Sequence, residues 1–143
     1  APVKPAPPSL TQYLGGDVTY QQQLRNMGKT LADFLAAQKL QKRKINEDYG
    51  SATKSMGLQK VQDLSNIEQD FSGRGLLTSG LYAGAVGDYN NDFLQRMAEL
   101  GKNQKRSLSD LFSQETNFRS QQKLDTQAAR EAAIRRRAEK YGL

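Results

Sequence analysis

Hydrophobic residues recur along the first half of the chain at alternating steps of four and three residues. The first run consists of Tyr20, Leu24, Met27, Leu31 and Phe34. This spacing places the side chains on one side of an α-helix, in a narrow seam typical of helix–helix packing rather than a broad globular face. The pattern blurs through AAQKLQKRK, resumes at Ile45 and reaches Phe71. We therefore predict one long helix with an apolar packing seam.

The same pattern returns after a glycine-rich stretch and predicts a second long helix. Its seam begins with Tyr82, Val86, Tyr89 and Phe93. The predicted fold class is all-α, with two long helical arms in a hairpin or coiled-coil-like arrangement joined by a Gly-rich turn. A glycine inside a helix costs about 1 kcal/mol relative to alanine. The arms could therefore be broken at Gly50, Gly57, Gly87 or Gly101.

Local signals near the N-terminus divide the chain further. All four prolines lie in residues 1–8, which predicts an extended arm because proline fixes φ and removes an amide donor. Ser9 and Gln12 have the spacing of a capping box, followed by Gly15 and Gly16, and predict one short helix. Thr19 and Gln22 have the same spacing and predict the start of the first long helix. The predicted segments are a Pro-rich arm with a short helix at 1–16, a first helical arm at 17–72, a turn at 73–80 and a second arm with a basic end at 81–143.

The stretch DFSGRGLLTSGLY, residues 70–82, could be a phosphate-binding loop or a turn. The dinucleotide-binding fingerprint requires glycine where Thr78 stands, and a P-loop requires Lys after Gly80, where Leu81 stands. Both motifs also follow a β-strand, whereas residues 58–71 have a helical pattern. A turn fits better, because glycine can end one helix and Thr78 or Ser79 can cap the next. Its predicted residues are Gly73, Arg74, Gly75, Ser79 and Gly80, with Arg74 either solvated or bonded to carbonyl groups at the helix end.

Composition narrows the function classes. Cysteine and histidine are both absent, so the chain has no thiol nucleophile, thiolate or imidazole metal ligand, or Ser–His pair. We predict no catalytic residue, metal site, cofactor or small-molecule substrate. Hydrophobic residues make up 36% of the chain and the mean hydropathy is −0.77, which suits an elongated or oligomeric protein better than a self-contained globule. No apolar run approaches the roughly 20 residues of a transmembrane helix, and APVKPAPPSL lacks the apolar part of a secretory signal, so we expect synthesis in the cytoplasm.

The C-terminal part is strongly basic, and the formal net charge of the chain is +6. Non-specific contact with nucleic acid is one interpretation, because cations neutralise phosphates without reading the base sequence. Favourable interaction of cations with the negative end of the helix dipole is the other. Three consecutive arginines point in different directions around a helix and cannot form one stripe. The candidate contacts are Arg130, Arg135, Arg136 and Arg137.

Several segments together resemble a known class of protein. DVTYQQQL and LADF are followed by DFSGRGLLTSGLYAGAVGDYNNDF and by a glutamine-rich helix ending in RRRAEKYGL. From about residue 17 onward, this combination resembles small helical virion proteins of the minor tail type from long-tailed phages of actinobacteria, with RGLLTSGLY as its most specific part. The resemblance implies a non-enzymatic structural protein of the particle, at the tail or the head-to-tail region, where threefold or sixfold assemblies occur.

Three functions are therefore open at this point. The first is a virion structural protein that assembles with itself and with other virion proteins. The second is an accessory protein that binds nucleic acid through its basic C-terminal helix. The third is a scaffolding or assembly factor that is absent from the mature particle.

Overall fold

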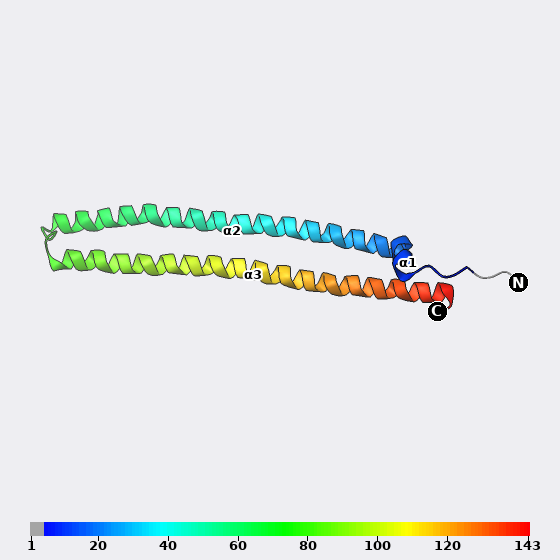
Figure 1. Cartoon of the computed structure of the whole chain (residues 1–143). Coiled ribbons are helices and arrows are strands. Elements are labelled where there is room, and N and C mark those ends of the chain that lie inside the picture. Colours follow the sequence, from blue (N-terminus) through cyan, green and yellow to red (C-terminus); the bar gives the residue numbers. More distant parts are fainter. Residues whose placement is uncertain (1–4) are drawn as a thin grey trace. The chain divides into compact units, whose positions relative to one another are not determined.

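The computed structural model of the chain describes residues 5–143, which contain three helices and no strand (Figure 1). Helix α1 spans Leu10–Gly16, α2 spans Val18–Gly73 and α3 spans Gly80–Tyr141. The all-α class predicted from the sequence is confirmed. Of the Pro-rich arm, Pro2 lies outside the described residues, and residues 5–9 have no regular secondary structure.

Helix α1 begins with the predicted capping box. The backbone N–H of Gln12 donates to Ser9 Oγ at 3.2 Å, and the backbone N–H of Ser9 donates to Gln12 Oε1 at 3.1 Å. These bonds satisfy two donors that the start of a helix leaves unpaired. The short helix predicted after Ser9 is confirmed.

The prediction that Thr19 and Gln22 cap α2 is wrong. The helix begins at Val18, and the Tyr20 backbone N–H donates to Asp17 Oδ1 at 2.9 Å. Asp is at least as good an N-cap residue as Thr. Since Asp17 stands two positions earlier, Thr19 already lies within the first helical turn.

Both long helices continue without interruption through their internal glycines. Helix α2 has 56 residues and includes Gly50 and Gly57, and α3 has 62 residues and includes Gly87 and Gly101. The breaks considered from the sequence are therefore not found. Hydrogen bonding along the helix and packing on its inner side outweigh the propensity cost of single glycines.

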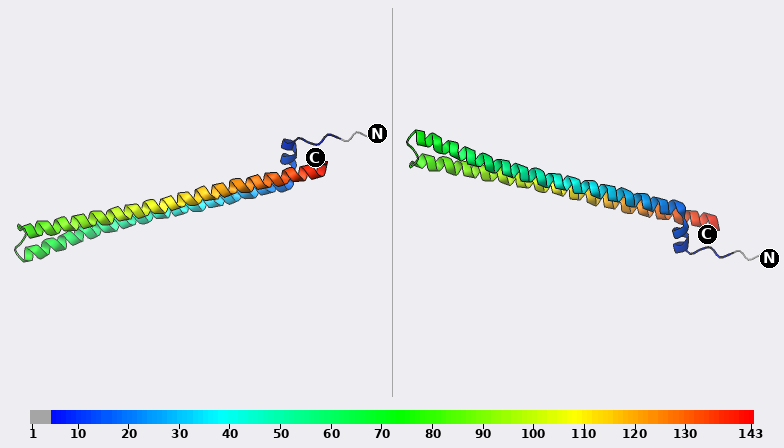
Figure 2. Two further views of the ribbon diagram at one scale, coloured as in Figure 1. Left: turned by 90° about the horizontal axis from the view of Figure 1, so that it is seen from below. Right: turned by 90° about the horizontal axis from the view of Figure 1, so that it is seen from above.

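Contacts divide the chain into two units, each formed by part of α2 and part of α3. We call Leu40–Leu111 the turn unit, and residues 5–39 with Phe112–Leu143 the terminal unit. Within each unit the two helices lie side by side and antiparallel (Figure 2). In the turn unit Asp63 contacts Tyr89 and Asn46 contacts Gln104, so a step forward along α2 corresponds to a step back along α3.

The inward-facing positions repeat after 18 residues in both helices. In α2 this relation joins Tyr20, Gln38 and Met56, all at least half-buried. In α3 it joins Tyr82, Leu100, Phe118 and Arg136, which are also half-buried. Eighteen residues make about five turns at about 3.6 residues per turn, so this seam fits an undistorted α-helix and requires little supercoiling.

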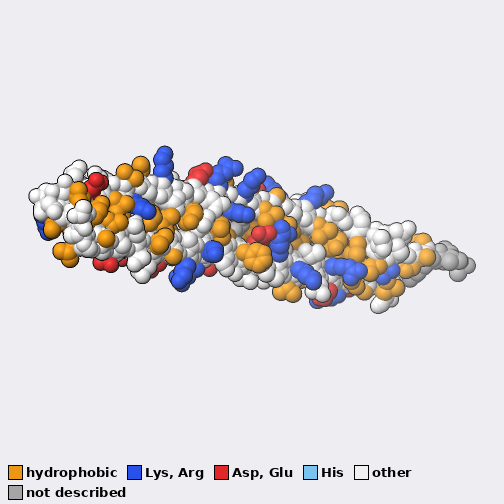
Figure 3. All heavy atoms as spheres, turned by 60° about the vertical axis from the view of Figure 1, so that its left-hand side comes forward, with side chains coloured by type: hydrophobic (Ala, Val, Ile, Leu, Met, Phe, Trp, Pro, Cys, Tyr) orange, Lys and Arg blue, Asp and Glu red, His pale blue; other side chains and the backbone are white. Residues whose placement is uncertain are grey.

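Few side chains are fully enclosed. Among the described residues the buried hydrophobic side chains are Tyr20, Leu111, Ala129 and Ala133. Hydrophobic side chains also reach the surface of the long helices, between Lys and Arg side chains (Figure 3). No helix in residues 5–143 combines the length and the apolar character needed to cross a membrane.

Candidate interaction surfaces

The best-buried part of the terminal unit lies where the start of α2 meets the end of α3. Tyr20 is 9% exposed and packs with Ala129 and Ala133, which are 7% and 0% exposed. Leu24 and Met27, two further predicted seam residues, pack against this cluster. The two alanines were not predicted, because alanine carries little hydrophobic signal in a segment that also contains arginine and glutamate. Their spacing of four residues was the signal that could have identified them.

The next layer of this seam is aromatic. The rings of Phe34 and Phe118 are stacked, with centroids 4.0 Å apart and planes 2° from parallel. Leu31, one turn earlier in α2, is half-buried. One turn beyond the rings, Gln38 Nε2 donates to Gln114 Oε1 at 3.2 Å. An apolar layer and a polar layer therefore follow one another, and Gln38 interrupts the apolar pattern at the start of AAQKLQKRK.

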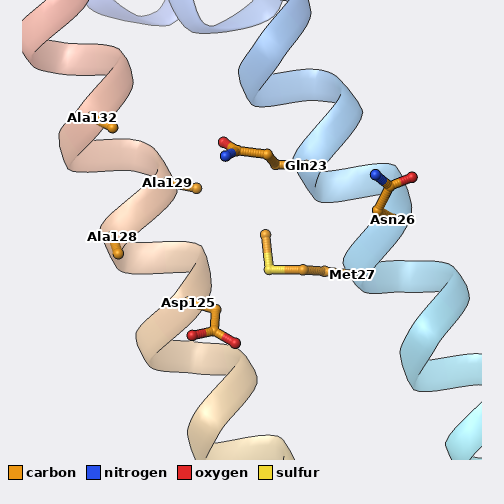
Figure 4. A pocket seen from close by; sticks show the side chains of 7 residues that line it. All are labelled: Gln23, Asn26, Met27, Asp125, Ala128, Ala129 and Ala132. Carbon is orange, nitrogen blue, oxygen red and sulfur yellow. The ribbon is translucent and has the colours of Figure 1, made fainter.

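A groove of about 410 Å³ lies beside the buried cluster (Figure 4). On the α3 side alanine methyl groups and the carboxylate of Asp125 form its wall, whereas longer polar side chains and Met27 extend from α2 (Figure 4). Met27 and Ala129, which belong to the buried cluster, also line it, so the groove reaches the edge of the apolar core. Its lining consists of Gln23, Asn26, Met27, Asp125, Ala128, Ala129 and Ala132.

A buried ion pair joins the start of α2 to the end of α3. Arg136 donates from Nε to Asp17 Oδ2 and from Nη2 to Asp17 Oδ1, both at 3.1 Å. The side chain of Asp17 is 5% exposed and that of Arg136 is 35% exposed. The hydrogen bonds from Arg136 lower the pKa of Asp17, the backbone N–H of Tyr20 acts in the same direction, and burial opposes them. The bidentate geometry makes this pair directional as well as electrostatic.

The segment before α1 is also held by α3. The guanidinium of Arg137 donates from Nε and Nη2 to the Pro8 carbonyl oxygen, at 3.1 and 2.9 Å. The rings of Tyr13 and Tyr141 meet edge to face, with centroids 6.3 Å apart. Two neighbouring arginines of the basic end thus bind two different parts of the N-terminal segment.

The four arginines predicted as nucleic-acid contacts therefore fall into two pairs. Arg136 and Arg137 are half-buried and bonded within the chain. Arg130 and Arg135 are exposed, and within residues 5–143 no hydrogen bond or ion pair involves their side chains. The structure does not bring the four together on one surface. The bonds of Arg136 and Arg137 could not be predicted from the sequence, because their partners are more than a hundred residues away in the chain.

The seam of the turn unit combines aromatic and polar contacts. The Tyr89 hydroxyl donates to Asp63 Oδ2 at 2.7 Å, and Gln59 Nε2 donates to Asp63 Oδ1 at 2.8 Å. These bonds lower the pKa of Asp63, with the Tyr89 bond as the larger cause. Burial and the hydrogen bond to the carboxylate raise the pKa of Tyr89. Asp63 occupies an inward position that an apolar pattern could not reveal.

The other predicted seam residues of this unit also lie at the α2–α3 boundary. Phe71 and Tyr82 have ring centroids 5.5 Å apart. Lys60 Nζ lies 4.7 Å from the centroid of the Phe93 ring, within the range of a cation–π contact. Val86 is half-buried.

The five predicted turn residues occupy the connection between α2 and α3. Gly73 is the last residue of α2 and Gly80 the first of α3. Gly75 has φ of +70°, and its N–H donates to the Ser72 carbonyl at 3.0 Å. The Leu76 N–H reaches the Phe71 carbonyl at 2.8 Å, which completes a Schellman motif at the end of α2.

Ser79 caps the beginning of α3. Its Oγ accepts the Tyr82 backbone N–H at 3.3 Å, and its hydroxyl donates to the Leu76 carbonyl at 2.6 Å. Arg74 lies 3.2 Å from Asp70 Oδ2, but both side chains are more than half exposed. Such a pair contributes little to stability, so Arg74 is mainly a solvated residue.

Taken together, these surfaces consist of packing contacts, helix caps and ion pairs. In residues 5–143 no group of three or more acidic side chains is arranged to hold a metal ion. The chemistry that the arrangement supports is the association of helices and of the N-terminal segment with them. Comparisons of the chain with protein families, with curated proteins and with solved structures found no significant match.

Proposed function

We propose that this protein is a non-enzymatic structural component of a phage particle, at the tail or the head-to-tail region. In this proposal it consists of two helical arms joined by the Gly-rich turn and assembles by helix packing with copies of itself and with other virion proteins. It uses no cofactor and no small-molecule substrate, and it acts in the virion after synthesis in the host cytoplasm.

The observation that carries the proposal is the small apolar core next to large exposed apolar side chains. Leu58, Leu94 and Phe112 are 66%, 64% and 70% exposed, although both helices are long. Two helices that pack along one seam leave their other sides uncovered, and most helical stability in proteins comes from tertiary packing. A chain of this kind gains stability when further helices cover those sides.

The resemblance to small helical virion proteins supports the choice of a phage particle over other assemblies. It rests on RGLLTSGLY and its flanking segments, which in this structure are the connection between α2 and α3 and the helix ends next to it. The Pro8–Arg137 and Asp17–Arg136 bonds support a role for the N-terminal segment in organising the end of α3 for assembly.

Two measurements test the proposal. The purified chain should sediment as an oligomer, with a melting temperature that rises with protein concentration. Imaging of mature particles with a labelled copy should place the protein in the tail or at the head-to-tail junction. A compact monomer with a concentration-independent melt would contradict the assembly mechanism, and absence from mature particles would indicate a scaffolding factor instead.

A further inference from the structure

The two sides of the helix pair in the turn unit differ in chemical character. In two antiparallel helices, the residue that follows each inward-facing residue lies on the same side of the pair, because the helices turn in opposite senses when seen from one end. One row of inward-facing residues, spaced by seven, consists of Tyr49, Met56 and Asp63 in α2 and of Val86, Phe93, Leu100 and Ser107 in α3.

The residues that follow this row are all glycine or leucine, whereas the inward-facing Ile67 and Gln104 are followed by Glu68 and Lys105. The glycines and leucines recur at steps of seven residues, and we call them the glycine–leucine face: Gly50, Gly57, Leu64, Gly87, Leu94, Gly101 and Leu108. The residues that precede the inward positions lie on the opposite side and, apart from Ala85, are polar or charged: Asp48, Ser55, Gln62, Asp92, Glu99 and Arg106. A groove lined by Asp48 of α2 and Asn103 of α3 lies on this opposite side, which agrees with the assignment.

The glycine–leucine face is partly exposed: Gly50, Gly87 and Leu94 are exposed, whereas Gly57, Leu64, Gly101 and Leu108 are half-buried. Leu94 is 64% exposed, and Val61 at its rim is 69% exposed. No described atom of the chain outside the local helix would lie within 4 Å of a Cβ atom added to Gly50, Gly57, Gly87 or Gly101. These glycines weaken their helices without any close contact inside the chain that requires them. A mainly apolar face with hollows at its glycines is suited to another helix that approaches closely.

We infer that the glycine–leucine face of the turn unit binds the same face of a second copy of the chain. This inference rests on the proposed self-assembly and names the surface that performs it. The face offers both ridges at its leucines and hollows at its glycines, so it is complementary to itself, as a twofold interface requires. The opposite face, with Asp92, Glu99 and Arg106, would have to bury charges in such a contact.

The size of the face is sufficient for a stable dimer. The α2 part of the turn unit, residues 40–73, is about 50 Å long at about 1.5 Å per residue, and two adjacent helices are about 20 Å wide. A rectangle of this size has an area on the order of 1,000 Å² on each copy, or about 2,000 Å² for two copies. Stable protein interfaces bury about 1,200–2,000 Å².

The test compares variants that have opposite effects on the isolated helix and on the dimer. Sedimentation equilibrium of the full chain gives the dimer Kd, and the melting temperature at high dilution reports the monomer. Gly57→Ala should stabilise the helix, since alanine is the better helix former, yet weaken the dimer by about tenfold or more, since the methyl group fills a hollow. Gly84→Ala, on the outer side of α3, should stabilise the helix equally and leave the Kd unchanged.

A second pair of variants removes apolar contact without touching a glycine. Leu94→Gln should weaken the dimer by about tenfold, whereas Leu58→Gln, of equal exposure but on the side of α2 away from α3, should change the Kd by less than about twofold. Because the chain contains no cysteine, Leu94→Cys and Leu58→Cys also serve as single probes. Assembly should protect the thiol at position 94 from alkylation and leave that at position 58 reactive.

The outcomes separate this inference from the proposed function. Self-association with an unchanged Kd in Gly57→Ala and Leu94→Gln would overturn the glycine–leucine face and leave assembly through another surface. A chain that stays monomeric at high concentration would overturn this inference and the self-assembly on which it rests. The position of the protein in the mature particle is measured independently by imaging.

Discussion

The carboxylate of Asp17 and the guanidinium of Arg136 are 119 positions apart in the chain and share two hydrogen bonds of 3.1 Å. The same carboxylate accepts the backbone N–H of Tyr20 and so caps α2. One buried side chain thus defines where a long helix begins and attaches that point to the end of another helix in the terminal unit.

We expect Asp17→Ala to destabilise the terminal unit. The variant loses the helix cap, which alone is worth about 1 kcal/mol, and it leaves Arg136 without its partner. Chemical unfolding at fixed protein concentration measures the loss. Asp33→Ala is the matched control, since Asp33 is exposed and lies in the same helix, and it should change stability by less than about 0.5 kcal/mol. Equal effects of the two variants would contradict this account.

The Asp17 pair also predicts a pH dependence. Because the pKa of Asp17 is lowered in the folded state, the unfolded state binds a proton first as the pH falls. The stabilisation of the folded state by ionised Asp17 is therefore complete above the unfolded pKa of about 3.9. It is lost as the pH falls through the lower pKa of the folded state. The stability difference between the wild type and Asp17→Asn should shrink as the pH is lowered from about 5 to about 2. A difference that is constant over this range would exclude a role for the charge.

The helical class, and the seam at Tyr20, Leu24 and Phe34, could be predicted because apolar residues at steps of three and four leave a clear signal. The seam positions Gln38 and Asp63 could not be predicted. Their polar side chains form hydrogen bonds across the two helices and so interrupt the apolar pattern. The start of α2 was misplaced because two residue types with similar capping ability compete locally. The contact that favours Asp17 comes from the other end of the chain.

At the turn, Gly73 and Gly75 were both predicted as turn residues, but we expect their substitution by alanine to affect stability differently. Gly75 has a positive φ, where a side chain costs about 1–2 kcal/mol, so Gly75→Ala should destabilise the turn unit by about that amount. Gly73 is helical, and a Cβ there meets no described atom within 4 Å outside the local helix. Gly73→Ala should therefore be neutral or stabilising in thermal unfolding. Equal losses in both variants would mean that Gly73 also requires a glycine.

The stacked phenylalanines provide a further prediction. Phe118→Ala should cost about 2 kcal/mol, below the range for a fully buried phenylalanine because the ring is only half-buried. Phe112→Ala, at a position that is 70% exposed, should cost much less in the folded monomer. The comparison is made by urea unfolding at high dilution, and a larger loss at Phe112 would indicate that it is covered by another copy even there.

The exposed arginines and the bonded arginines of the basic end should differ in their effect on the affinity for duplex DNA. Arg130→Gln with Arg135→Gln removes exposed cations and should reduce the slope of log K against log salt by about one per lost phosphate contact. Arg136→Gln with Arg137→Gln should instead reduce stability, because these side chains hold Asp17 and Pro8. Fluorescence anisotropy at several salt concentrations, together with melting curves, separates the two effects. An affinity that does not change in the first double variant would exclude Arg130 and Arg135 as DNA contacts.

The 18-residue repeat of the inward positions means that the length of the helix pair can change in fixed increments. Eighteen residues correspond to about 27 Å at about 1.5 Å per residue. Removing one such block from α2 and the facing block from α3 returns every remaining inward side chain to its original direction. The α2–α3 pair of the turn unit can therefore be shortened or lengthened by whole blocks while the pattern of its contacts is retained.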